Sequence, residues 1–179
     1  MITSRLFVLS FTLSLVMVLG SLALPGSALA HEERQVGPYT FIVGFREEPA
    51  IVHQPNSIDL TIESAGQGIE GLHETLQAEV IVGGGAQKRD LPLEPSFGEP
   101  GRYESWFIPT VAGDYTFHVF GEIAGQAIDE TFDSGPETFS PVEVLSELQF
   151  PEIVPTNNEL ASQIGGLEMT APIPPSSWP

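Results

Sequence analysis

The 179-residue chain contains no cysteine, and this absence removes several kinds of protein from consideration. Without cysteine there is no disulfide framework, no thiol nucleophile, no c-type haem attachment and no cysteine-based zinc site. A bacterial lipid anchor is excluded as well, because that lipid is attached to a cysteine at the cleavage point. A folded domain in this chain must therefore be stabilised by its own hydrophobic core.

Positive charge is also scarce. Six Lys and Arg residues stand against 24 Asp and Glu residues, which gives a formal net charge of −18. Such an excess of carboxylates repels nucleic acids and anionic lipid surfaces, so we expect no nucleic-acid partner. The charge serves solubility; the alternative interpretation is that it attracts a cationic partner.

Catalytic signatures are missing too. The chain has no Gly-x-Ser-x-Gly, no His-Glu-x-x-His and no EF-hand loop. The run Gly83-Gly84-Gly85 follows a predicted strand but opens no helix, which is typical of a hairpin turn rather than of a phosphate-binding loop. We therefore expect a protein that is not an enzyme.

The first thirty residues have the pattern of a secretory signal peptide. Arg5 precedes an uncharged apolar run over residues 6–24, and Ala28-Leu29-Ala30 is a small-x-small cleavage site. Cleavage there predicts an extracytoplasmic chain, in the periplasm, in the cell envelope or secreted, that begins at His31 and has no stable membrane span. The alternative is an uncleaved anchor, because the apolar run is long enough to cross a bilayer. Cleavage is favoured because Pro25 and Gly26 break the helix just before the site.

Most of the remaining chain alternates apolar and polar residues in short segments. Residues 39–45, 58–63 and 76–82 show the two-residue period of β-strands, and turn residues separate the segments. Residues 87–93 suit an edge strand, because Pro92 cannot donate to a ladder. About seven such strands predict an all-β fold, an immunoglobulin-like antiparallel β-sandwich. Gly113-Asp114-Tyr115 fits the tyrosine corner of that fold, the alternative being an ordinary buried tyrosine.

After the strands the character of the sequence changes. Residues 139–150 predict an edge strand or an ordered strap, and Thr156 with Glu159 forms a capping-box pattern before a short helix. The last residues are rich in proline and predict disorder. The expected organisation is a signal peptide (1–30), an N-terminal arm (31–38), the sandwich (39–135), a strap or linker (136–155), a short helix (156–168) and a disordered Pro-rich tail (169–179).

Two of the four histidines are candidate metal ligands. His31 as the first mature residue would offer an amine and an imidazole together, a pair that chelates metals such as copper. An extended arm over residues 31–38 reaches roughly 25 to 28 Å and could bring His31 to a distant ligand. His118 lies mid-strand, which is a rigid platform for such a ligand. The alternative is that His31 merely follows the cleavage site and His118 is a hydrogen-bonded surface residue; zinc is the alternative metal.

Several stretches resemble a known group of exported bacterial domains. The residues are Val36-Gly37-Pro38-Tyr39, the run from Gly44 to Ala50, Gln54-Pro55-Asn56 and Tyr115-Thr116-Phe117-His118. They are similar to immunoglobulin-like envelope domains of the YtkA-like kind, which are distantly similar to CopC-type periplasmic copper carriers. In those carriers the mature N-terminal histidine helps to bind copper(II), which implies this role for His31 only.

Together these observations predict an exported, non-catalytic binding or accessory module of the cell envelope that binds copper(II) through His31 with His118. The alternative is a metal-independent protein–protein interaction module, which docks a sheet edge or its acidic face on another envelope protein.

Overall fold

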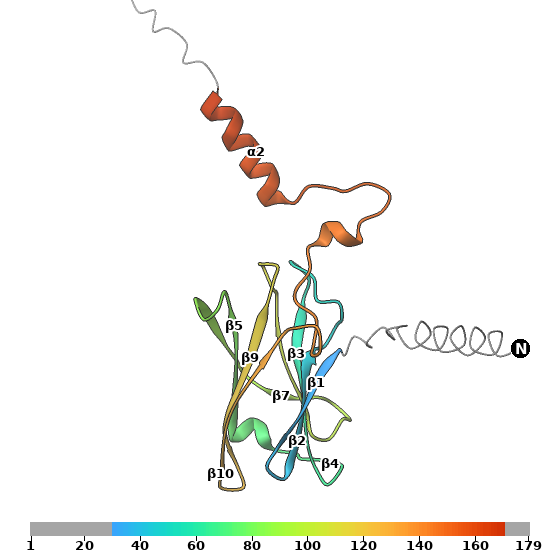
Figure 1. Ribbon diagram of the computed structural model, residues 1–179, viewed down its shortest axis with the longest axis vertical. Helices are drawn as coiled ribbons and strands as arrows, with labels where there is room; N and C mark the ends of the chain where they lie inside the picture. The colour runs from blue at the N-terminus through green and yellow to red at the C-terminus, as the bar shows by residue number, and fades with distance from the viewer. Residues whose placement is uncertain (1–29, 171–179) are drawn as a thin grey trace, which may run out of the picture.

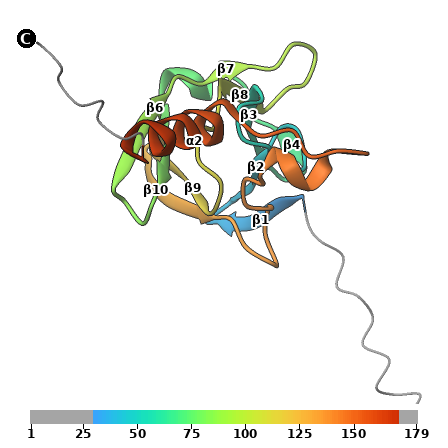
Figure 2. The ribbon, with the colours of Figure 1, turned by 90° about the horizontal axis from the view of Figure 1, so that it is seen from above.

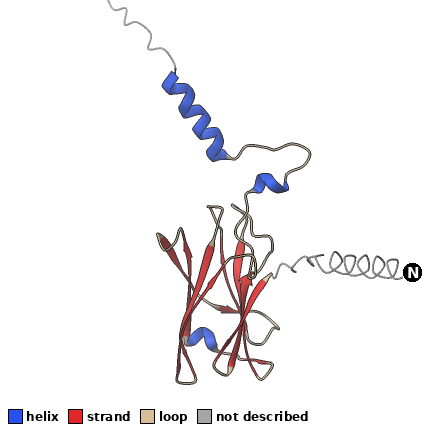
Figure 3. Cartoon of the chain, viewed as in Figure 1, coloured by secondary structure: helices blue, strands red, loops and turns tan. Residues whose placement is uncertain are grey.

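The structure of this chain is a computed structural model that describes residues 30–170; the predicted signal peptide and most of the predicted tail lie outside these residues. Two antiparallel sheets pack face to face, and a C-terminal extension leads away from one end of them (Figures 1 and 3). The predicted all-β sandwich is confirmed.

The order of the strands identifies the kind of sandwich. One sheet has the order β1-β2-β3-β8-β7, with β4 paired to β3, and the other has the order β10-β9-β5-β6. The layers β2-β3-β8-β7 and β10-β9-β5 have the connectivity of the ABED and GFC sheets of an immunoglobulin fold, with β6 as an added edge strand. The strands are β1 (His31–Val36), β2 (Tyr39–Phe45), β3 (Asn56–Ser64), β4 (Gln67–Gly68), β5 (Leu76–Val82), β6 (Gln87–Leu91), β7 (Glu94–Pro95), β8 (Arg102–Phe107), β9 (Tyr115–Ile123) and β10 (Gln126–Asp133).

Strand β1 corrects one expectation from the sequence. Residues 31–36 are not an extended arm but a strand that pairs with β2 along its whole length, from His31 opposite Gly44 to Val36 opposite Tyr39. Gly37, with a positive φ of 59°, and Pro38 make the two-residue turn of this hairpin. The hairpin holds His31 at a fixed place on the sheet, so it cannot swing across the domain.

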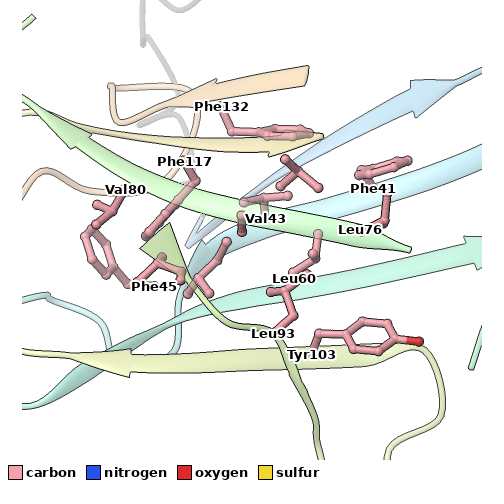
Figure 4. Close-up of a cluster of buried hydrophobic side chains, with 14 of the residues drawn as sticks. Phe41, Val43, Phe45, Leu60, Leu76, Val80, Leu93, Tyr103, Phe117 and Phe132 are labelled. Carbon is pink, nitrogen blue, oxygen red and sulfur yellow. The ribbon is translucent and has the colours of Figure 1, made fainter. Parts of the chain in front are cut away.

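The core lies between the two sheets and is rich in aromatic rings (Figure 4). Phe45 is fully buried and contacts Phe117 at 5.1 Å and Phe139 at 5.7 Å between ring centroids. Phe41 stacks on Phe132 across the sheets at 6.1 Å. Burial of these rings, rather than any crosslink, supplies the stability that a cysteine-free chain needs.

The predicted tyrosine corner is confirmed. Tyr115 begins β9, its ring is buried, and its hydroxyl donates a hydrogen bond of 2.9 Å to the backbone oxygen of Val111. The bond closes the loop that carries the chain from one sheet to the other.

Replacing Tyr115 with Phe is expected to lower the free energy of unfolding by about 1 kcal/mol, because it removes one hydrogen bond while keeping the ring. Urea denaturation measures the difference. Tyr39→Phe is the matched control, since the hydroxyl of Tyr39 makes only a 3.5 Å contact with the oxygen of Ile123. Equal unfolding of the two variants would contradict a stabilising corner.

The segment after β10 closes one end of the sandwich. We call residues 136–144 the strap: Phe139 is fully buried, the backbone of Val142 exchanges hydrogen bonds with Gly113, and Glu143 donates to the oxygen of Ala50. The sequence predicted an edge strand or an ordered strap over residues 139–150; the contacts observed here are made by Phe139, Val142 and Glu143, in the first half of that range. Two 3-10 helices, η1 (Leu72–Glu74) and η2 (Leu145–Leu148), are short turns before β5 and after the strap.

The last described element is α2 (Asn157–Thr170), which stands beyond one end of the two sheets in Figure 1 and is therefore seen in front of them from above in Figure 2. The predicted capping box is present: the amide of Thr156 donates to Glu159 Oε2 at 2.6 Å, and the amide of Glu159 donates to Thr156 Oγ1 at 3.3 Å. Within residues 30–170, no helix is both long and apolar enough to cross a membrane.

Candidate functional site

His31 lies at the start of β1, on the outer face of the first sheet. Its partner in the register is Gly44, and the residues on either side of Gly44, Val43 and Phe45, point into the core. A Cβ atom at Gly44 would come within 2.8 Å of His31 Cδ2. Because Gly44 has no side chain, the imidazole of His31 can pack against the sheet at this position.

The imidazole of His31 is oriented by a buried carboxylate. His31 Nε2 lies 3.1 Å from Asp59 Oδ2, on β3, which is separated from β1 by β2; within residues 30–170, His31 Nδ1 forms no hydrogen bond. Asp59 also accepts hydrogen bonds from Arg102 of β8, from Nε at 2.6 Å and from Nη2. The Asp59 side chain is only 4% exposed, so His31 and Arg102 cover it from two sides.

These hydrogen-bond partners stabilise the ionised form of Asp59. Burial works to raise its pKa, but the hydrogen bonds from His31 and Arg102 outweigh burial and lower the pKa to about 2. Asp59 therefore stays ionised at neutral pH. A carboxylate that bonds one ring nitrogen fixes the orientation of a histidine and leaves the other nitrogen available.

A second carboxylate lies close to His31 but has a very different environment. Glu48 follows β2 in a loop that Asn56 fixes, since Asn56 bonds both the amide and the oxygen of Glu47. Both carboxylate oxygens of Glu48 are buried, and neither is hydrogen-bonded at normal geometry. Burial raises the pKa of Glu48 to about 7, against the lowering effects of His31 and of Ser140 in the strap.

Glu48→Gln is expected to make the metal-free protein more stable than wild type above pH 7. Because the folded pKa of Glu48 is raised, its stabilising effect is present in acid and is lost as the pH rises through about 7. The expected gain at pH 8.5 is about 1 kcal/mol, since partial exposure lets solvent screen the charge. Urea denaturation at pH 5 and pH 8.5 checks it. Glu47→Gln, at the exposed neighbour, is the control, and the same pH dependence in wild type and Glu48→Gln would contradict the account.

His118 lies in the other sheet, on the outer face of β9. Both of its ring nitrogens are taken up: Nδ1 lies 2.9 Å from Glu79 Oε1 and Nε2 lies 2.7 Å from Asp129 Oδ1. The ring also stacks on Phe120 at 4.8 Å. Burial lowers the pKa of His118, but the bonds to Glu79 and Asp129 outweigh this effect and raise it.

The structure does not bring His31 and His118 together. They belong to different sheets, and each faces outward, so the hydrophobic core lies between them. One copy of the chain therefore cannot combine them in one site, and the arm that was expected to close the gap is strand β1. No group of three or more His, Asp and Glu side chains is already arranged around a metal position among residues 30–170.

The two carboxylates beside His31 were not singled out from the sequence. Asp59 is a polar residue of the alternating segment 58–63, and such positions usually face water, whereas Asp59 is 3% exposed. Glu48 gave no signal, because its burial depends on the strap, which follows it by some ninety positions in the sequence. The packing of β1, β3, β8 and the strap brings His31, Asp59 and Glu48 close together, and the sequence alone does not show this.

Comparison with known proteins finds only distant similarities to solved structures. No protein-family model and no curated protein matches the chain. A solved DUF4426 family protein from Pseudomonas aeruginosa PAO1 is similar over 64% of this chain and 98% of its own, at 14% identity and a TM-score of 0.45. The Lin-41 filamin domain is similar over 51% of this chain and 89% of its own, at 20% identity and a TM-score of 0.33. Both scores are too low to carry a functional argument, and neither protein is described as YtkA-like or CopC-type.

Proposed function

We propose that this chain is an exported, non-catalytic binding or accessory module of the cell envelope that binds copper(II) through His31 at its mature N-terminus. After cleavage at Ala30, the α-amine and Nδ1 of His31 can close a six-membered chelate ring on one metal ion. The observation that carries the proposal is the bond of His31 Nε2 to the buried Asp59 carboxylate, which leaves Nδ1 for the metal.

The residues around His31 suit a cupric ion. Imidazole and amine nitrogens are ligands that copper(II) prefers, and a carboxylate behind the imidazole fixes its tautomer and the orientation of its ring. The Asp59 carboxylate has this position, with Arg102 holding it in turn. Glu48 is the nearby carboxylate that forms no ion pair with a Lys or Arg side chain of residues 30–170, and a cation at His31 would supply positive charge beside its buried oxygens.

Removal of the His31 imidazole is expected to weaken copper(II) binding about 100-fold, because a chelating pair is reduced to a single amine. Isothermal titration of copper(II) into the mature chain, produced with His31 as its first residue, measures the affinity. His31→Ala is compared with His118→Ala, which removes a histidine whose two nitrogens are already bonded. An equal affinity for wild type and His31→Ala would end the proposal.

Two further changes separate the role of the amine from that of the position of the ring. Acetylation of the His31 α-amine keeps the imidazole but removes the amine as a donor, so it should weaken binding as His31→Ala does. Gly44→Ala keeps both donors but places a Cβ atom within 2.8 Å of the imidazole, so we expect an intermediate loss of about 10-fold.

A second candidate function rests on a different observation. Beyond the strap, large apolar side chains are exposed on an extension that the sandwich does not cover, which suits a metal-independent protein–protein interaction module of the cell envelope. These residues are Leu148 (52% exposed), Phe150 (94%), Ile153 (70%), Val154 (63%) and Ile164 (59%).

Two measurements distinguish the two functions: retention of the chain on membranes and its affinity for copper(II). Retention of the mature chain on envelope membranes would be measured with added copper(II) and with a chelator. The interaction module predicts that Phe150→Ser together with Ile153→Ser abolishes retention and that the chelator changes nothing. The copper proposal predicts that those substitutions leave the copper affinity unchanged.

A further inference from the structure

One pocket of the molecule is lined by positively charged side chains, whereas the chain as a whole is strongly negative. It opens between the ends of β5, β6 and β8 and has a volume of about 280 Å³. Val80, Phe107 and Tyr115 are among the buried residues that line it, and Val82 and Ile108 add further apolar surface. Although the chain has 24 acidic residues, no Asp or Glu lines this pocket, whereas Lys88 and Arg89 both do.

Arg89 is the cation that faces this pocket. In the register of β5 and β6, Arg89 lies opposite the buried Val80, and Leu91, two positions along the strand, is also buried. Because side chains alternate along a strand, Arg89 is on the inner side of β6. Lys88 is on the outer side, where its Nζ lies 2.9 Å from Glu79 Oε2.

Arg89 also differs from every other cation that the structure describes. Within residues 30–170, Arg34, Arg46, Lys88 and Arg102 each form an ion pair with a carboxylate. The Arg89 side chain forms none there, although carboxylates outnumber cations fourfold in the chain. A guanidinium presents a planar set of donors that matches a carboxylate, and here it belongs to a residue that lines a pocket together with apolar side chains.

We propose that this pocket binds a small monocarboxylate with an apolar body, whose carboxylate pairs with Arg89 and whose body contacts Val80, Phe107 and Tyr115. The volume lies near the lower end of the range for small-molecule pockets, so the ligand is of fragment size. This pocket is formed without His31, Asp59 or Glu48, so the inference does not depend on copper binding.

Sodium octanoate is the probe, and its binding to the metal-free mature chain is followed by isothermal titration and by methyl NMR signals of Val80, Val82 and Ile108. We expect saturable binding of one octanoate, with shifts at these methyl groups. Arg89→Gln should weaken it at least about 10-fold, as expected for loss of a charge-assisted bond. Lys88→Gln removes the same charge from the neighbouring position on the other side of the strand, and it should weaken binding less than about twofold.

Several outcomes would overturn the proposal. They are no saturation at millimolar octanoate, an equal loss in Arg89→Gln and Lys88→Gln, or equal binding of octan-1-ol, which has the same chain without the charge. Far-ultraviolet circular dichroism confirms that both variants are folded; both substitutions are at exposed positions of an edge strand.

Discussion

Replacement of Asp59 with Asn is expected to lower the free energy of unfolding by about 2 to 3 kcal/mol at pH 7. Asn cannot satisfy the positive charge of Arg102, which now bonds Asp59 through Nε at 2.6 Å and through Nη2. Breaking a buried pair typically costs about 3 to 5 kcal/mol, and the cost is smaller here because Arg102 is partly exposed and keeps its bond to Glu99.

The same substitution should flatten the acid side of the stability curve. The pKa of Asp59 is lowered in the folded state to about 2, so its contribution is present above the unfolded pKa near 4 and is lost as the pH falls toward 2. Urea denaturation of wild type and Asp59→Asn at pH 7, 5 and 2.5 measures both effects. Asp90→Asn, at an exposed site, serves as control and should change stability by less than about 0.5 kcal/mol. Parallel pH curves for wild type and Asp59→Asn would refute this role of Asp59.

Phe139→Ala is expected to be at least as damaging, with a loss of about 3 to 5 kcal/mol. Phe139 is fully buried, 5.7 Å from Phe45 and 5.4 Å from Phe117 between ring centroids. It is the side chain that anchors the strap in the aromatic core. Its removal should therefore leave a cavity and loosen the strap from the loop that carries Glu48.

Two measurements test this prediction. Urea denaturation gives the loss of stability, and Phe150→Ala is the matched control, because Phe150 is 94% exposed and should matter little. NMR titration of the Glu48 carboxyl carbon gives the local effect. Since burial raises the pKa of Glu48, loosening of the strap should move that pKa from about 7 back toward its ordinary value. An unchanged pKa in a folded Phe139→Ala variant would show that the strap does not bury Glu48.

Features specified by local sequence were predicted well. The alternation of β2, β3 and β5, the tyrosine corner at Tyr115 and the capping box at Thr156 each depend on neighbouring residues, and each is present. The edge position of β6 followed from Pro92. Strand β1 was missed because its residues are mostly polar and charged, so that its pairing with β2, rather than any apolar alternation, makes it a strand.

The candidate site was only partly predictable for the same reason. His31 was singled out from its place after a cleavage pattern, but its partners come from strand pairing and from a distant strap. Asp59 is buried because His31 and Arg102 cover it, which alternation alone cannot reveal. His118 was paired with His31 on the assumption of a long arm, and its bonds to Glu79 and Asp129 agree instead with the alternative of a hydrogen-bonded surface histidine.

The claim that His31 binds copper(II) through its amine and its imidazole is tested most directly by electron paramagnetic resonance with one equivalent of copper(II). Mature chain beginning at His31 is prepared with natural nitrogen and with ¹⁵N-histidine only. Because both proposed nitrogen donors belong to this one histidine, the labelled sample should show two ¹⁵N couplings, and His118→Ala should show the same spectrum. A spectrum that ¹⁵N-histidine does not change, or one that survives His31→Ala, would contradict the account.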